Sequence, residues 1–270
     1  MSGYLSRTSR RHREARFAPS LWIALAVAVV YGTVFTSLSA TSGIAYNEWF
    51  ATGANAWRSA VLPLAAGAAV LIAFLLRSRW DGIFRDPERL PMRRFYWVVV
   101  GLFTLGILLH LLFVQWQQLT VSLLVAILVA GVLVGFCEEV LFRGILLRAL
   151  RTHGHAEFWV VLVTSVLFGA FHLANVLNGS SWNAALSQMG IAAASGVALY
   201  LFRRGSGLLL LAMIAHGLWD ISVFLPSNGD SAGQLISLGV SATLTFFGVV
   251  VVLVSLAHDR HMVITQKPRS

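Results

Sequence analysis

The chain alternates long apolar runs with short polar and charged segments. A membrane-spanning helix needs about 20 mostly apolar residues, and eight stretches of the sequence approach that length. They lie at 20–40, 59–76, 95–114, 120–141, 157–177, 184–202, 207–225 and 232–257. The fourth differs from the others because two acidic residues, Glu138 and Glu139, stand near its end. The pattern predicts an all-α polytopic membrane protein with about eight transmembrane helices joined by short loops.

Composition supports that class and excludes two others. Hydrophobic residues make up 57% of the 270 residues and charged residues only 11%, whereas soluble domains carry about 25% charged residues. Too few polar residues remain to cover a water-facing surface, and disordered chains are poor in apolar residues. With one cysteine, Cys137, the chain forms neither an intrachain disulfide nor a zinc-finger cluster.

The distribution of charge predicts the topology. The net charge of +9 might suggest nucleic acid, but the basic residues form short clusters between apolar runs. Cytoplasmic loops of membrane proteins are enriched in Lys and Arg. With a cytoplasmic N-terminus, 19 of the 20 Lys and Arg residues fall on the cytoplasmic side, and only Arg58 does not. That count assigns Arg143, Arg203 and Arg204 to the cytoplasmic ends of spans. We therefore expect both termini in the cytoplasm, a lipid bilayer around the chain and no nucleic-acid partner.

The expected organisation is a single bundle with two polar ends. Residues 1–19 form a basic cytoplasmic segment, residues 20–257 the transmembrane bundle, and residues 258–270 a cytoplasmic tail. Nearly all basic residues are Arg and Ala is abundant, which is typical of GC-rich bacterial genomes. We therefore expect a multi-pass protein of the cell membrane, most simply a bacterial plasma membrane.

Ionisable side chains inside a bilayer are costly and are retained for pairing or for function. Glu139 and Arg143 are four residues apart, so they share a helix face and can pair. Glu138 lies about 100° round the helix and is not served by that pair. Alone, this motif is explained equally well by a salt-bridged helix end. Gly131 and Gly135 precede it as a GxxxG pattern, which allows close approach of a neighbouring helix.

Two further motifs place polar residues on inner spans. Phe168 and His172 are one turn apart in the fifth span, and His216 and Asp220 are one turn apart in the seventh. Each has a structural reading, as a hydrogen-bonded core histidine or a bracing His–Asp pair. Together with Glu138, however, these residues supply the three roles that peptide hydrolysis requires. They are a base that takes a proton from water, a second group that binds the same water, and a hydrogen-bond donor to an oxyanion.

Other polar residues are assigned no catalytic role. His110 is expected at the membrane interface, and Asn175 is expected in a loop. Ser195 is interpreted as a small packing residue rather than a nucleophile. Trp219 stands beside Asp220 and either lines the site or only packs.

The three motifs resemble those of a known family. Glu-Glu-x-x-x-Arg at 138–143, Phe-x-x-x-His at 168–172 and His-x-x-x-Asp at 216–220 are similar, in order and spacing, to motifs of the CAAX-protease and bacteriocin-processing (CPBP, or Abi) intramembrane proteins. The similar region covers about 120–225, a little under half of the chain.

The resemblance implies an eight-helix bundle with endopeptidase activity inside the membrane. It implies that Glu138 is the catalytic base, that His172 helps to hold water, and that His216 with Asp220 forms the oxyanion hole. Three further residues support the site: Glu139, Arg143 and Phe168.

Two features of the site stay open at this point. The family pattern often has Asn where this chain has Asp220, and an ionised Asp cannot donate a hydrogen bond. Asp220 therefore orients His216, stays protonated or binds a metal. Glu138, His172, His216 and Asp220 also have the donor types of a zinc site, but His-Glu-x-x-His is absent. We favour a metal-free, glutamate-dependent mechanism over a zinc ion.

The sequence says less about how deep each site residue lies in the membrane and about the substrate. In straight helices Glu138 would lie near the cytoplasmic end, His216 at mid-membrane and His172 deeper, so they meet only if the helices are tilted or offset. The expected substrate is a membrane-associated protein or peptide. The alternative from another class is a non-catalytic immunity protein or a transporter that uses the same polar cluster.

Overall fold

The computed structural model describes residues 15–80, 82–86 and 94–226, together with positions 239, 243, 247, 250 and 254. Within these residues the chain forms helices and no strand, which confirms the predicted all-helical class. The α-helices are α1 (Leu21–Thr41), α2 (Gly53–Ala56), α3 (Leu62–Ser78), α4 (Arg94–Leu112), α5 (Val121–Glu138), α6 (Leu147–Thr152), α7 (Glu157–Phe171), α8 (Trp182–Ser206) and α9 (Leu209–Phe224). The π-helical segments are η2 (Trp57–Val61) and η4 (Glu139–Leu146), and the 3₁₀ segments are η1 (Tyr46–Glu48), η3 (Trp116–Gln118) and η5 (His172–Asn178).

Several of these helices are suited to a bilayer. Five helical stretches of the described residues are long and apolar enough to cross a membrane: Leu21–Thr41, Gly53–Ser78, Val121–Thr152, Glu157–Asn178 and Trp182–Ser206. Two shorter apolar helices, Trp97–Leu112 and Leu209–Phe224, lie where the third and seventh spans were predicted. The chain is a multi-pass membrane protein. The predicted span 232–257, residues 1–14 and the tail 258–270 fall outside the continuously described segments, so eight spans and cytoplasmic termini stay predictions.

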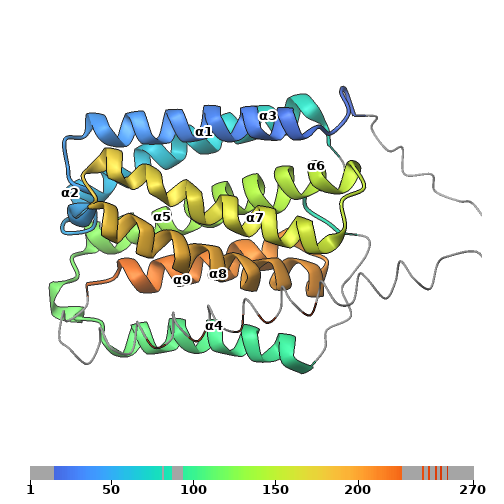
Figure 1. Ribbon diagram of the computed structural model, residues 1–270. Helices are drawn as coiled ribbons and strands as arrows, with labels where there is room; N and C mark the ends of the chain where they lie inside the picture. The colour runs from blue at the N-terminus through green and yellow to red at the C-terminus, as the bar shows by residue number, and fades with distance from the viewer. Residues whose placement is uncertain are drawn as a thin grey trace, which may run out of the picture.

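The long helices run side by side with their axes roughly parallel (Figure 1). Helices α1 and α3 pack together on one side of the bundle, and α4 lies on the opposite side, where it packs on α8 and α9. Between these layers α5 packs on α9, and α7 packs on α8. The three motifs lie on the inner helices α5, α7 and α9 and on η4 and η5, which directly follow α5 and α7.

Local sequence sets the ends of the inner helices. Thr120 caps α5, because its hydroxyl accepts a hydrogen bond from the Leu123 amide at 3.2 Å. Ser181 caps α8 in the same way through the Ala184 amide, also at 3.2 Å. Helix α8 ends at Gly207, whose φ of 75° is the left-handed conformation that glycine adopts without strain.

Glycines bring α5 and α9 into backbone contact. A Cβ atom on Gly131 would lie 2.9 Å from the Gly217 carbonyl oxygen, and one on Gly217 would lie 2.8 Å from the Gly131 oxygen. The predicted close approach at the GxxxG pattern is therefore present. It places the turn of α9 that carries His216 directly against the helix that carries Glu138.

Candidate active site

Glu138 lies inside a long helix and not at a helix end. α5, η4 and α6 form one continuous stretch, Val121–Thr152, of 32 residues, and α5 contributes the first 18, ending at Glu138. The helix therefore continues past residue 141, where the fourth span was predicted to end. The physical reason is that Arg143 is not at a water-facing end but is fully buried in protein, with 0% exposure. The turns after Glu138 are π-helical, a geometry often found at functional sites.

Glu139 and Arg143 form the ion pair that their spacing predicts. Arg143 Nη1 donates to Glu139 Oε1 at 2.7 Å, and neither side chain is exposed. The Arg143 guanidinium also lies over the Phe168 ring, 4.2 Å from its centroid. A buried charge is tolerated when it is paired in this way. The pair fixes the η4 turn against α7.

Glu139 also holds His216. The Nδ1 atom of His216 lies 2.9 Å from Glu139 Oε1, and since a carboxylate only accepts, Nδ1–H donates. The other ring nitrogen, Nε2, faces two carboxylates, at 3.9 Å from Glu138 Oε2 and 3.7 Å from Asp220 Oδ2. The residue in hydrogen-bond contact with Nδ1 is thus Glu139, and Asp220 lies near Nε2.

His172 is oriented by its own helix. Its Nδ1 lies 3.0 Å from the Phe168 carbonyl oxygen, which can only accept, so Nδ1 carries the proton. In the neutral ring Nε2 is then left with a free lone pair. The Phe168 ring stands edge-on to both histidines, with its centroid 5.2 Å from that of His172 and 5.4 Å from that of His216. Phe168 thus contacts His172, His216 and the Arg143 guanidinium.

These side chains meet at a cavity of about 380 Å³. Its wall includes all four residues proposed as catalytic: Glu138, His172, His216 and Asp220. Glu138 Oε2 is buried and has no hydrogen-bond partner among the described residues. The offset expected for straight helices is removed because Glu138 lies well inside its helix and α9 crosses directly against it. Much of the remaining wall is aromatic: Phe35, Trp49, Phe50, Phe103, Trp219 and Phe224.

Sequence reasoning missed several residues of this wall. His110 lines the cavity and lies 3.2 Å from the Ser222 hydroxyl through Nδ1, whereas an interfacial position was expected. Asn175 is buried at the wall, where a loop position was expected, and Ser195 lines it too. Trp219 also belongs to the wall, which decides between its two readings. Asn175 stands one turn after His172, a spacing that could have pointed to it, whereas no spacing signal connects His110 to the motifs.

The donor set does not match a metal site as it stands. Among the described residues, no group of three or more His, Cys, Asp or Glu side chains is arranged to hold a metal ion. The Nδ1 atom of His216 is engaged by Glu139, so the other ring nitrogen, Nε2, is the one that a metal ion would have to use; it lies 3.9 Å from Glu138 Oε2 and 3.7 Å from Asp220 Oδ2. We therefore derive no step through a metal.

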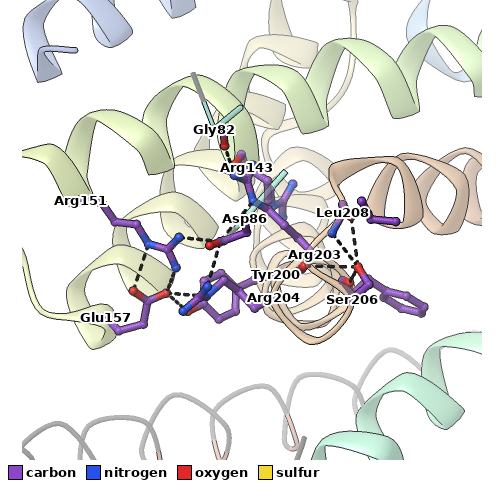
Figure 2. A network of polar contacts seen from close by, with 11 residues as sticks. Gly82, Asp86, Arg143, Arg151, Glu157, Tyr200, Arg203, Arg204, Ser206 and Leu208 are labelled. Carbon is purple, nitrogen blue, oxygen red and sulfur yellow. Dashed lines mark hydrogen bonds and ion pairs between the residues drawn. The ribbon is translucent and has the colours of Figure 1, made fainter. Parts of the chain in front are cut away.

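A second polar cluster ties the bundle together away from the cavity (Figure 2). Asp86 accepts from Arg151 at 2.6 Å and lies 2.9 Å from Arg204, while Glu157 pairs with both arginines. Burial alone would raise the pKa of the Asp86 carboxyl, but the neighbouring guanidiniums outweigh burial and hold its pKa below the ordinary 3.8. The cluster joins segment 82–86 to α6, α7 and α8. Arg203 donates to the Arg143 carbonyl oxygen, which connects the cluster to η4.

This cluster gives three arginines of the charge count a structural role. Arg143, Arg203 and Arg204, which the topology count places at the cytoplasmic ends of spans, are buried in ion pairs and hydrogen bonds. Their packing accounts for their positions, and the cytoplasmic side assigned to them stays a prediction.

Comparison with known protein families gives a match. Residues 120–222 match the family described as "Type II CAAX prenyl endopeptidase Rce1-like". The matched segment runs from the cap of α5 to α9 and contains all three motifs. No curated protein and no solved structure matches the chain. The match confirms the CPBP resemblance over this segment and indicates protease activity within a membrane. The segment that carries Glu138, His172, His216 and Asp220 is similar to the type II CAAX prenyl endopeptidases, whereas the part of the cavity wall that precedes residue 120 lies outside the match.

Proposed function

We propose that this chain is an intramembrane endopeptidase that hydrolyses a peptide bond of a membrane-associated protein or peptide. One observation carries the proposal: the Glu138 carboxylate lines the cavity beside His172 and His216, and its Oε2 has no hydrogen-bond partner in the described chain. The neighbouring Glu139 binds Arg143 and His216 through Oε1 and is not among the residues that line the cavity. Glu138 is therefore the carboxylate available to a water molecule.

In the first step Glu138 acts as general base. It accepts a proton from water as the water oxygen attacks the scissile carbonyl carbon, and the carbonyl π pair moves to the oxygen. The free lone pair on His172 Nε2 accepts a hydrogen bond from the same water and orients it. The product of this step is a tetrahedral intermediate with a negatively charged oxygen.

His216 stabilises that oxygen as an imidazolium. In this form both ring nitrogens carry a proton, so Nδ1–H donates to Glu139 while Nε2–H donates to the oxyanion. The carboxylates of Glu138, Glu139 and Asp220 lie within 4 Å of the ring and favour the charged form. Asp220 thereby acts through His216, since an ionised Asp donates nothing itself.

In the last step the intermediate collapses. The C–N bond breaks, the carbonyl re-forms, and protonated Glu138 returns its proton to the leaving amine nitrogen. The products are a new carboxyl terminus and a new amino terminus, and Glu138 is again a carboxylate. No metal ion is needed for these steps, and we propose the glutamate-dependent mechanism over a zinc-dependent one.

We propose a peptide or leader sequence in a bacterial plasma membrane as the substrate, with the N-terminus of the enzyme in the cytoplasm. The matched family is named for prenylated CAAX substrates. A farnesylated CAAX peptide and the same peptide without lipid distinguish the two classes. The family match does not favour a non-catalytic immunity protein or a transporter.

The test compares protein termini in host membranes that carry the wild type, Glu138→Gln or Glu48→Gln. Glu138→Gln keeps the size and polarity of the side chain. Glu48 is exposed in η1, so its substitution is a matched control. We expect new termini with the wild type and Glu48→Gln only. Identical profiles in all three, with equal amounts of folded protein, would overturn the proposal in favour of a binding protein.

A further inference from the structure

Three polar side chains outside the motifs line the same cavity as Glu138. They are Tyr46 of η1, Asn175 of η5 and Gln188 of α8. Gln188 Nε2 donates to the Tyr46 hydroxyl oxygen at 2.7 Å, and Asn175 Nδ2 donates to Gln188 Oε1 at 2.9 Å. The two bonds form one chain that crosses three separate elements, so the fold holds these groups in fixed relation to one another.

Among the described residues, these two hydrogen bonds leave one donor and one acceptor of the three side chains unused. Tyr46 uses its oxygen to accept from Gln188, so its own proton is not used in that bond. Asn175 donates through Nδ2, so Oδ1 stays available. Within the described part of the chain, neither the Tyr46 proton nor Asn175 Oδ1 has a partner of its own. The two ends of the chain therefore offer an O–H donor and a carbonyl acceptor.

These free groups stand in an otherwise apolar part of the cavity that reaches the surface. Trp49 and Phe50 line the wall with Tyr46, and the Trp49 ring centroid is 4.9 Å from that of Tyr46. Ala184 and Ser187 also line the cavity and are exposed, so the cavity reaches the surface on the α8 turns that precede Gln188. A peptide that enters here leaves water and must find partners for its N–H and C=O groups.

We propose that Tyr46, Gln188 and Asn175 form a subsite that binds the substrate main chain beside the scissile bond. The Tyr46 hydroxyl donates to a substrate carbonyl oxygen, and Asn175 Oδ1 accepts from a substrate amide N–H. Both groups of the substrate lie on one edge of an extended chain, as in a strand pair. Gln188 is a positioning residue that holds the other two. This inference rests on the proposed endopeptidase function, since it requires a peptide substrate.

The first test measures kcat and KM for the peptide identified by its new termini. Tyr46→Phe removes only the hydroxyl and keeps the ring beside Trp49. Asn175→Leu removes the acceptor at similar volume. We expect each variant to raise KM about tenfold and to leave kcat within about twofold, because a ground-state contact is lost. Asn183→Leu, at an exposed position outside the cavity wall, is the matched control and keeps the wild-type KM.

The second test separates binding from a structural role. Ester analogues of the peptide replace one amide at a time and so remove one N–H donor each. At the position whose amide N–H binds Asn175, the ester raises the KM of the wild type about tenfold. It does not raise the KM of Asn175→Leu further, because the acceptor is already missing there. An ester effect of equal size in both proteins at every position would overturn the subsite. A fall in kcat at unchanged KM in Tyr46→Phe would overturn it as well.

Failure of this inference is distinguishable from failure of the proposed function. If the wild type generates no termini beyond those of Glu138→Gln, the endopeptidase proposal fails and the subsite fails with it. If the wild type cleaves its peptide while Tyr46→Phe and Asn175→Leu keep the wild-type KM, only the subsite fails.

Discussion

The contact between α5 and α9 gives a sharp prediction, because a single methyl group should separate His216 from Glu139, which holds it. A Cβ atom on Gly135 would collide with the Met213 carbonyl oxygen and lie 3.1 Å from the Gly217 nitrogen. Ordinary contacts of carbon need about 3.5 Å or more, so Gly135→Ala must push α9 away by roughly 1 Å.

That displacement acts directly on the site. His216 lies between Met213 and Gly217 on α9, and its hydrogen bond to Glu139 is 2.9 Å long. A shift of roughly 1 Å lengthens it to about 3.9 Å, beyond the range of a hydrogen bond. Misplacement by that amount costs on the order of 100-fold in rate. We therefore expect Gly135→Ala to lose about 100-fold in kcat/KM while the protein still folds.

The assay is peptide cleavage by purified protein in lipid vesicles, with the thermal midpoint measured in parallel. Gly101→Ala is the matched control, since a Cβ atom there meets no other atom within 4 Å. It should keep wild-type activity. Wild-type activity in Gly135→Ala, at an unchanged thermal midpoint, would refute the reasoning that the α5–α9 backbone contact positions His216.

Other predictions concern charge, topology and metal. The ionised Asp86 contributes stability that is complete above its ordinary pKa of 3.8 and is lost as the pH falls through its lower folded-state pKa. Asp86→Asn should therefore lower the thermal midpoint by about 5 °C at pH 7, with a smaller difference at pH 3; an equal difference at both pH values would contradict this. The native cysteine, Cys137, is fully buried, so a membrane-impermeant maleimide should label Ser187→Cys in intact cells and Arg79→Cys only after permeabilisation. The reverse pattern would invert the topology. Incubation with a zinc chelator should leave the cleavage rate unchanged, whereas loss of activity that zinc restores would establish a metal-dependent mechanism.

The apolar pattern predicted the helices well because span length and hydropathy are properties of local sequence. The first seven predicted spans coincide with described helices, and the ion pair of Glu139 with Arg143 follows from their spacing alone. The continuation of the fourth helix was not predicted, because charged residues normally mark the end of a span. Here the charges of Glu139 and Arg143 neutralise each other inside the protein, and the helix continues to Thr152.

The composition of the cavity wall was less predictable than its motifs. Residues spaced by whole turns on one helix, such as His216 and Asp220, can be found from sequence because they share a face. Tyr46, His110 and Gln188 come from separate elements, and only tertiary packing brings them to the cavity. The Glu139–His216 bond joins residues 77 positions apart and has no local signal.

The most direct test of the central claim is the rate of peptide-bond hydrolysis by purified wild type and Glu138→Gln in vesicles, at saturating substrate and with a zinc chelator present. General-base catalysis typically contributes 10²–10⁴-fold. If Glu138 is the general base, Glu138→Gln cleaves the peptide about 1000-fold more slowly than the wild type. The control Glu48→Gln keeps the wild-type rate. A rate for Glu138→Gln within about tenfold of the wild type, well under that contribution, would contradict the assignment of Glu138 as the general base.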